Sequence, residues 1–154
     1  MNQTDQRYHH FVQILREELV PAMGCTEPIA IAYGAAKARE VLGRLPEKIL
    51  VEASGNIIKN VKSVVVPNTG GLKGIEASAA AGVVAGDAGN ILEFISQVTD
   101  AQKEAIKAYL ASHEVRVAPA PGDVVFDIIV TLTAGEDTVR LRIADYHTNI
   151  VLIE

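Results

Sequence analysis

The residue best suited to chemistry is Cys25, the only cysteine of the chain. It lies in the run Gly24-Cys25-Thr26-Glu27-Pro28, between two segments with helical patterns. At a helix N-terminus, free N–H groups and the helix dipole favour an anion, so we expect the pKa of this thiol to be lowered. A thiolate binds soft metals or attacks carbon. Cys25 is therefore a candidate ligand or nucleophile; the alternative is a small buried apolar residue.

Two polar residues flank the thiol. Thr26 is expected to cap the second helix, and Pro28 then falls in the first turn, where its missing N–H costs nothing. Glu27 can stabilise the same helix end electrostatically. Its functional alternative is a general base beside the thiolate.

A second cluster follows a predicted strand and consists of Ser54, Asn56, Lys59 and Asn60. Ligand sites are often built at strand ends. A hydroxyl, two amides and an ammonium could hold the carboxylate of an amino acid. The alternative is a polar turn.

Two loops complete the set of candidates. The first is the run Pro67-Asn68-Thr69-Gly70-Gly71 before a helix of small residues, and such loops can bind anions through backbone N–H groups. The second is His147-Thr148-Asn149, in which His147 could carry a proton or be a turn histidine. The spacing fits neither a Walker loop nor a dinucleotide fingerprint, and there is no nucleophile elbow.

Helices predominate in the first part of the chain. Phe11, Ile14, Leu15 and Leu19 recur at helical spacing. Thr4 or Asp5 can cap this helix, and Thr99 or Asp100 a later one. The expected helices cover about 5–20, 28–42 (ending at Gly43), 74–86, 91–97 and 100–113.

Strands predominate in the last part. Val139, Leu141 and Ile143 alternate with Arg140 and Arg142, which is typical of a half-exposed antiparallel strand. A turn at 134–137 predicts a hairpin. The expected strands are 47–53, 115–117, 124–133, 138–144 and 146–153, with a short apolar piece at 63–66 and a helical turn or loop at 57–60. The pattern predicts an α+β fold: N-terminal helices, then a mostly antiparallel sheet of about four to five strands with helices packed on it.

Composition limits the class of protein. A chain of 154 residues with 49% hydrophobic and 21% charged residues is expected to form a single α+β domain, 1–154. The net charge of −5 argues against nucleic acid as a partner. No segment is apolar and long enough to span a bilayer. We expect a cytoplasmic protein in which the free thiol stays reduced, and the apolar final residues suggest a piece of a longer chain.

In their order and separations, the segments around Cys25, Ser54–Asn60, Val66–Gly70 and His147–Val151 resemble the L-cysteine desulfidase family, which is related to the iron–sulfur L-serine dehydratases. The resemblance covers nearly the whole chain, and Gly-Cys-Thr-Glu-Pro is its most specific part. It implies a lyase that converts L-cysteine and water into pyruvate, sulfide and ammonia, with an oxygen-sensitive 4Fe-4S cluster held by three cysteines. The fourth iron is left open for the leaving group.

A base must take the substrate α-proton, and Glu27 and His147 are our candidates for it. By position, the resemblance makes Cys25 the first cluster ligand. It implies a substrate site made of Thr26, Ser54, Asn56, Lys59, Asn60, Thr69, Gly70 and Asn149. The chain departs from the family in two ways: it is much shorter and lacks the other two cysteines, and Asn68 stands where the family more often has glycine. It therefore resembles an N-terminal domain that is inactive until a C-terminal half, in cis or in trans, supplies the missing ligands. The small-residue helix from Gly74 is then expected to pack against the missing part.

Two other functions remain open. The chain could be a non-catalytic domain that binds an amino acid or regulates, or a purely structural domain that forms a homo-oligomer.

Overall fold

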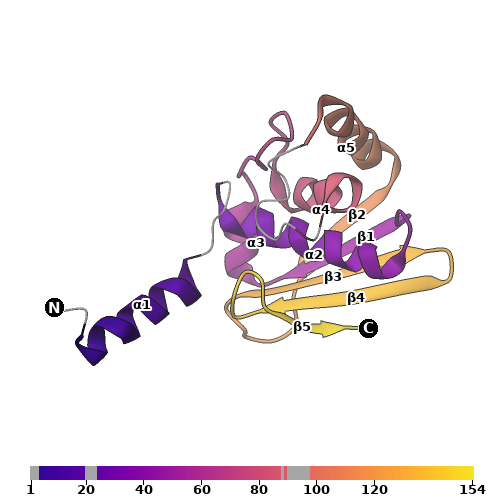
Figure 1. The fold of residues 1–154 in the computed structure, drawn as a ribbon. Coiled ribbons are helices and arrows are strands. Elements are labelled where there is room, and N and C mark those ends of the chain that lie inside the picture. Colours follow the sequence, from indigo (N-terminus) through magenta and orange to yellow (C-terminus); the bar gives the residue numbers. More distant parts are fainter. Residues whose placement is uncertain (1–3, 20–23, 88, 90–97) are drawn as a thin grey trace.

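The computed structural model describes residues 4–19, 24–87, 89 and 98–154 (Figure 1). The predicted helix at 91–97 lies outside these residues. The elements, in chain order, are α1 Gln6–Glu18, α2 Thr26–Leu42, β1 Lys48–Ala53, α3 Gly55–Val61, α4 Gly74–Ala85, α5 Asp100–Ser112, β2 Glu114–Pro119, β3 Asp127–Ala134, β4 Asp137–Ala144 and β5 Ile150–Ile153.

The strands form one sheet in the order β2-β1-β3-β4-β5. β1 is parallel to β2 and antiparallel to β3, and β3–β4 and β4–β5 are antiparallel as well. The α+β prediction is confirmed: helices come first, and a mostly antiparallel sheet with helices packed on it follows. The predicted hairpin joins β3 to β4 through Gly135 and Glu136, and Gly135 has a φ of 60°.

Local signals set the helix ends. Asp5 caps α1 by accepting from the N–H of Arg7, and Thr99 caps α5 in a reciprocal pair with Gln102. α2 ends where Gly43 takes a left-handed φ of 75°. The predicted cap at Thr26 is off by one residue, because Cys25 is the N-cap of α2 and Thr26 is its first helical residue.

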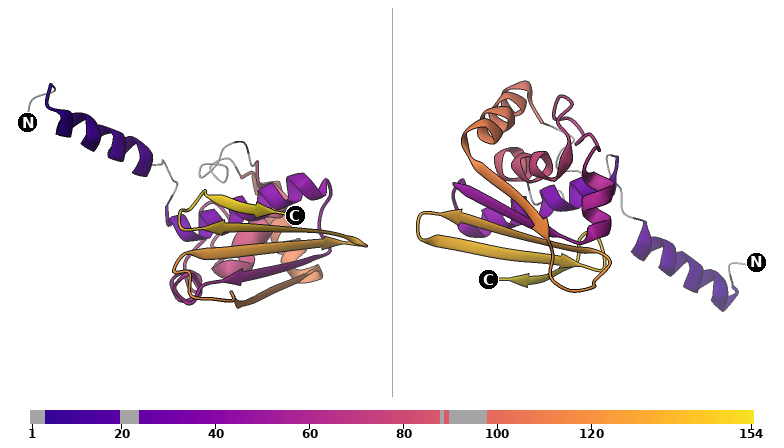
Figure 2. Two further views of the ribbon diagram at one scale, coloured as in Figure 1. Left: turned by 90° about the horizontal axis from the view of Figure 1, so that it is seen from below. Right: turned by 180° about the vertical axis from the view of Figure 1, so that it is seen from behind.

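The helices cover one face of the sheet. α2 lies on β3 and β4, α4 lies on β1 and β2, and α5 packs outside α4 (Figures 1 and 2). The small-residue helix was expected to pack against the missing part of the protein, and it has a close partner within this chain. α4 packs against α2, and alanines on both helices are fully buried there, including Ala32, Ala35 and Ala79.

The opposite face of the sheet is polar. Among the described elements no helix packs on it (Figure 2). It carries ion pairs instead: Arg140 lies 3.9 Å from Glu52 and 3.6 Å from Glu154. Arg142 donates at 2.8 and 2.9 Å to both carboxylate oxygens of the buried Asp127.

Two predicted strands begin later than expected, and the apolar piece at 63–66 is not a strand of the sheet. Residues 124–126 leave the sheet because the carbonyls of Val125 and Phe126 accept from Ser54 and from the N–H of Asp145. Residues 146–149 form a turn closed by hydrogen bonds between Asn149 and the carbonyls of Ala144 and Tyr146. The apolar piece at 63–66 forms only an isolated bridge, between Val65 and Lys73.

None of the helices in the described part of the chain is both long and apolar enough to cross a membrane.

Candidate functional site

Cys25 is exposed, at the N-terminus of α2. The α2 helix forms because a run of alanine and isoleucine follows Pro28 and buries nearly all of its length against the sheet and α4. The N-cap position leaves the thiol outside this core. Its Sγ donates a hydrogen bond to Oε2 of Glu27 over 3.0 Å. The alternative interpretation, a small buried apolar residue, is therefore wrong.

The pKa of the Cys25 thiol is raised, opposite to the predicted direction. Partial burial of the sulfur is the largest cause, followed by the hydrogen bond to Glu27, which favours the protonated thiol. Both effects outweigh the helix dipole, because the Glu27 carboxylate lies only two residues away. The Cys25 sulfur therefore keeps its proton, and Glu27 accepts the hydrogen bond that this proton makes.

Glu27 joins three elements in one cluster. Its pKa is lowered, first by the hydrogen bond from Cys25 and also by His147 and by the Asn60 side chain. Asn60 lies near the end of α3, and His147 lies in the turn between β4 and β5. The fold therefore brings together four of the predicted residues, Cys25, Glu27, Asn60 and His147, although they span more than 120 positions of the sequence.

His147 has an unsatisfied nitrogen. Its Nε2 is buried and has no hydrogen-bond partner, and its ring lies 4.5 Å from that of Phe126 between centroids. Burial lowers the pKa of His147, and the charge of Glu27 opposes this only in part. The imidazole is neutral at pH 7 and can accept or donate one more hydrogen bond. Phe126, which positions the ring, was missed in the sequence because a lone phenylalanine beside a strand carries no chemical signal.

Ser54 and Asn56 face a different hollow. Ser54 Oγ donates to the carbonyl of Val125 over 2.7 Å. Ser54 and Asn56 line a cleft of about 310 Å³ together with Gly122, Asp123 and Asp127. They lie at the start of α3 and Asn60 near its end. The seven residues of α3 span about 10 Å at 1.5 Å per residue. Lys59 is exposed on the last turn of α3, beside Asn60.

The loop 67–71 begins against Gly24, the residue before Cys25, and the hydroxyl of its Thr69 points inward. Pro67 Cγ lies 3.2 Å from the point where a Cβ on Gly24 would stand. Thr69 is fully buried and donates to the carbonyl of Val66 over 2.8 Å, so its hydroxyl supports the loop. Asn68 and Gly70 have φ values of 56° and 74°. A left-handed φ explains why glycine or asparagine suits position 68.

Asn149 is exposed, and its side-chain amide donates to the carbonyl of Ala144 over 3.0 Å. It closes the turn that holds His147. Thr26 is half-buried in the first turn of α2.

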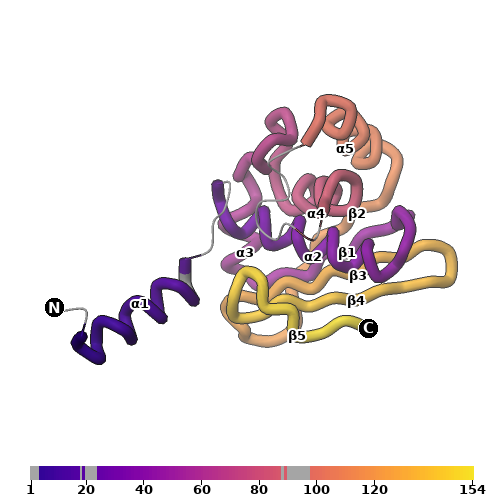
Figure 3. The backbone as a smooth tube through the Cα atoms, viewed as in Figure 1, coloured from indigo at the N-terminus to yellow at the C-terminus, as the bar shows by residue number. Residues whose placement is uncertain are grey.

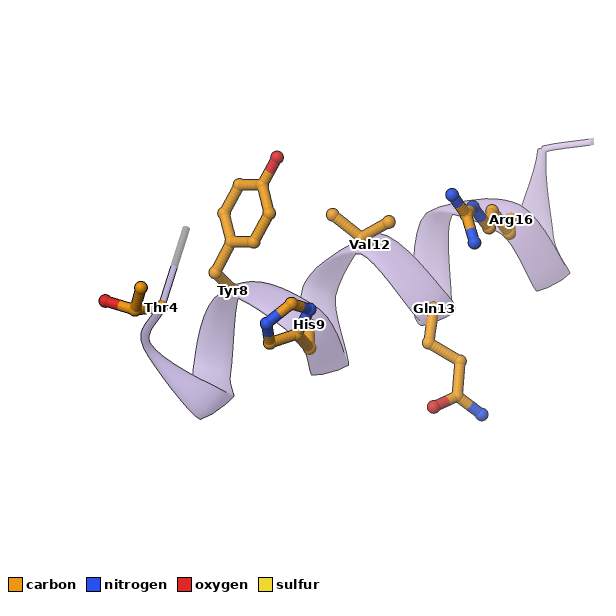
Figure 4. Close-up of a pocket in the computed structure, with 6 residues that line it drawn as sticks. All are labelled: Thr4, Tyr8, His9, Val12, Gln13 and Arg16. Atoms are coloured by element: carbon orange, nitrogen blue, oxygen red, sulfur yellow. The ribbon is translucent and has the colours of Figure 1, made fainter. Parts of the chain in front are cut away.

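Another hollow, of about 810 Å³, lies along α1 and is lined only by residues of that helix and of its N-terminal flank (Figure 4). It is an open groove on one helix, so it offers no converging groups. The described residues hold no group of three or more histidine, cysteine, aspartate or glutamate side chains placed to bind a metal ion.

Known proteins match the whole chain, but only as part of a longer one. A UPF0597 protein of Desulfitobacterium hafniense is 59% identical over all 154 residues, which make up 36% of its length. The chain resembles about a third of a UPF0597 protein. UPF0597 proteins of Treponema denticola and Finegoldia magna are 47% and 51% identical over 100% and 94% of the chain, and 36% and 35% of their own lengths. No protein-family model matches the chain, and no solved structure matches it.

The chain thus spans about a third of the length of these UPF0597 relatives. This agrees with the expectation of a partial protein. The names of the relatives state no reaction or substrate.

The Cys25–Glu27 pair gives a prediction that needs only this chain. In Glu27→Gln the charge that repels a thiolate is gone, so the pKa of Cys25 should fall toward its ordinary value and the thiol should ionise at lower pH. The rate of alkylation by iodoacetamide as a function of pH measures this. Glu17→Gln, on α1, is the control and should leave the profile unchanged. An unshifted profile in Glu27→Gln would mean that the carboxylate does not hold the thiol proton.

Proposed function

We propose that the chain is the N-terminal part of an iron–sulfur-dependent lyase of the L-cysteine desulfidase type, which converts L-cysteine and water into pyruvate, hydrogen sulfide and ammonia. The observation that carries this proposal is the exposed Cys25 thiol, hydrogen-bonded to Glu27 and grouped with Asn60 and His147. The resemblance of the Gly-Cys-Thr-Glu-Pro segment to that family supplies the reaction.

The donor set suits one ligand of a cluster and no more. Cys25 is accessible, and its proton already has an acceptor in Glu27, so the sulfur can become a thiolate when a metal binds. A 4Fe-4S cluster needs several thiolates, and this chain has one cysteine. The remaining ligands would come from the part of the longer protein outside this chain. When bound, the cluster would supply a Lewis acid for the departing sulfur.

The other residues have roles that follow from their protonation. Glu27 has a lowered pKa and is ionised at neutral pH, so it can accept the hydrogen bond of the Cys25 thiol. His147 is neutral, because burial lowers its pKa, and we assign it as a candidate base for the substrate α-proton. Lys59 and Asn60, exposed on α3, are suited to the substrate carboxylate.

Ser54 and Asn56, two candidates for binding the substrate carboxylate, line the separate cleft at the start of α3. We assign Ser54 and Asn56 to fixing the start of α3, which in turn orients Asn60 near the end of the same helix. Thr69, Gly70 and Asn149 shape the two loops beside the site.

Anaerobic co-production tests the proposal. This chain would be produced together with the part of the Desulfitobacterium hafniense UPF0597 relative that it does not match. We expect iron and acid-labile sulfide to co-purify with the pair, and pyruvate to form from L-cysteine faster than from L-serine. Each part alone should form none.

A pair that binds neither iron nor sulfide would overturn the assignment. Calorimetry with L-cysteine on the isolated chain tests the non-catalytic alternative. If the chain binds L-cysteine tightly and the pair shows no turnover, an amino-acid-binding domain is favoured.

A further inference from the structure

The α1 helix presents an apolar stripe that no other described element covers. Phe11, Ile14, Leu15 and Leu19 lie at i, i+3, i+4 and i+8, on one face, and are 53%, 51%, 53% and 69% exposed. The helix projects away from the body of the chain in every view (Figures 1, 2 and 3). It makes no extensive contact with any other described element.

The opposite face of α1 is polar and internally paired. Gln13 donates to Glu17 over 2.8 Å, one turn along the helix. An isolated helix of 13 residues is marginal in water even when it is well capped. The stripe and the cap therefore indicate a helix whose stability comes from packing its apolar face on a surface outside the described elements.

Helices or charged side chains already occupy the two faces of the described sheet. One face of the sheet is filled by α2 and α4, and the other carries the ion pairs of Arg140 and Arg142. Four apolar side chains cannot enter either face without displacing a helix or leaving buried charges unpaired.

We propose that the apolar stripe of α1 docks into an apolar groove on the part of the longer polypeptide that the UPF0597 relatives carry beyond this chain. The chain covers only 36% of those relatives, so most of the polypeptide is available as the occupant. This inference does not depend on the reaction proposed above.

A second copy of the chain fits the stripe less well. Two α1 helices would meet over about 20 Å, at 1.5 Å per residue, and bury only four apolar side chains each. Such a contact is small against the loss of translational and rotational freedom on association. A groove in the same polypeptide avoids most of that loss, because the linked chain raises the effective concentration.

Docking would also constrain the thiol. Four residues separate Leu19 from Gly24, which has a φ of 130° and lies against Pro67 just before Cys25. A seated α1 and the packed α2 would therefore hold Cys25 from both sides.

The test compares one charge on the two faces of α1. Leu15→Asp places a carboxylate in the stripe, and Gln13→Asp places the same side chain on the polar face. We expect Leu15→Asp to weaken the complex of this chain with the unmatched part of the Desulfitobacterium hafniense relative by roughly tenfold or more, as truncation of a central apolar contact does. Gln13→Asp should change it by less than about twofold. Cys25→Ser, measured in air without iron, should leave the complex intact, which separates docking from cluster assembly.

Three outcomes would overturn the proposal. One is an equal effect of the two substitutions. Another is concentration-dependent self-association of the isolated chain, in sedimentation velocity, that Leu15→Asp abolishes, because the occupant would then be a second copy. The third outcome comes from hydrogen exchange, which needs no complex of separate parts. Docking should make exchange slower in the segment of the intact relative that matches α1 than in α1 of this chain alone. Equal exchange rates would rule out docking.

Discussion

Gly82→Ala should destabilise the folded chain by about 3 kcal/mol or more, at the upper end of the cost of overpacking a core. A Cβ at Gly82 would overlap the carbonyl oxygen of Ala32 and would stand 2.9 Å from Cβ of Ala35. Both residues lie on α2, which is buried between the sheet and α4 and has no room to retreat. The α2–α4 contact is the main contact within the helical layer, so the substitution should lower the unfolding free energy of the whole domain.

Two other helical glycines provide matched controls. At Gly34 a Cβ would meet the end of the Ile143 side chain at 3.2 Å, and that side chain can move, so Gly34→Ala should cost about 1 kcal/mol. At Gly55 a Cβ would meet nothing within 4 Å, and Gly55→Ala should be neutral or stabilise by about 0.5 kcal/mol. Urea unfolding followed by far-UV circular dichroism measures all three. If Gly82→Ala and Gly55→Ala unfold within about 0.5 kcal/mol of each other, the two helices do not pack as closely as described.

The same close approach explains one error of the sequence-based interpretation. Gly74, Ala77, Ser78 and Gly82 predict a helix that packs tightly, and α4 does so. The sequence does not say against what, because small residues suit any close neighbour. The partner is α2, about 45 residues earlier, and its alanines carry the matching signal.

Elements with local causes were predicted well. The end of α2 at Gly43, the cap of α5 at Thr99 and the hairpin between β3 and β4 each follow from residues within one turn of the event. The parallel pairing of β1 with β2 was not predicted. It joins Lys48–Ala53 to Glu114–Pro119 across the three described helices α3, α4 and α5, and no local pattern specifies such a neighbour.

The candidate site was predicted by residue type and not by arrangement. Cys25, Glu27, Asn60 and His147 meet as one group, whereas Ser54 belongs to another cleft and the Thr69 hydroxyl is buried. Neither separation could be derived from spacing, because the side a loop residue faces depends on packing. The direction of the thiol pKa was predicted wrongly because partial burial of the sulfur and its hydrogen bond to Glu27 both raise that pKa.

Cys25→Ser should reduce pyruvate formation from L-cysteine by about 1,000-fold or more in the chain co-produced with the rest of the relative, which is the size of effect expected when a Lewis acid is lost. The iron and sulfide content should fall with it. A serine hydroxyl keeps the size and the hydrogen bond to Glu27 but does not provide a soft thiolate. A loss of turnover without a loss of cluster would instead make Cys25 a nucleophile.

The control for this substitution is Ser112→Ala. Ser112 is an exposed residue at the end of α5 whose hydroxyl donates to the carbonyl of Ala108. Ser112→Ala removes a polar atom of similar size from a helix end outside the candidate site. Both iron content and turnover should therefore be unchanged. Because Cys25 is exposed at the N-cap, Cys25→Ser should also leave the unfolding free energy within about 0.5 kcal/mol of the parent chain. If both variants retain full iron content and turnover, the sulfur of Cys25 holds no metal, and its assignment as a cluster ligand fails.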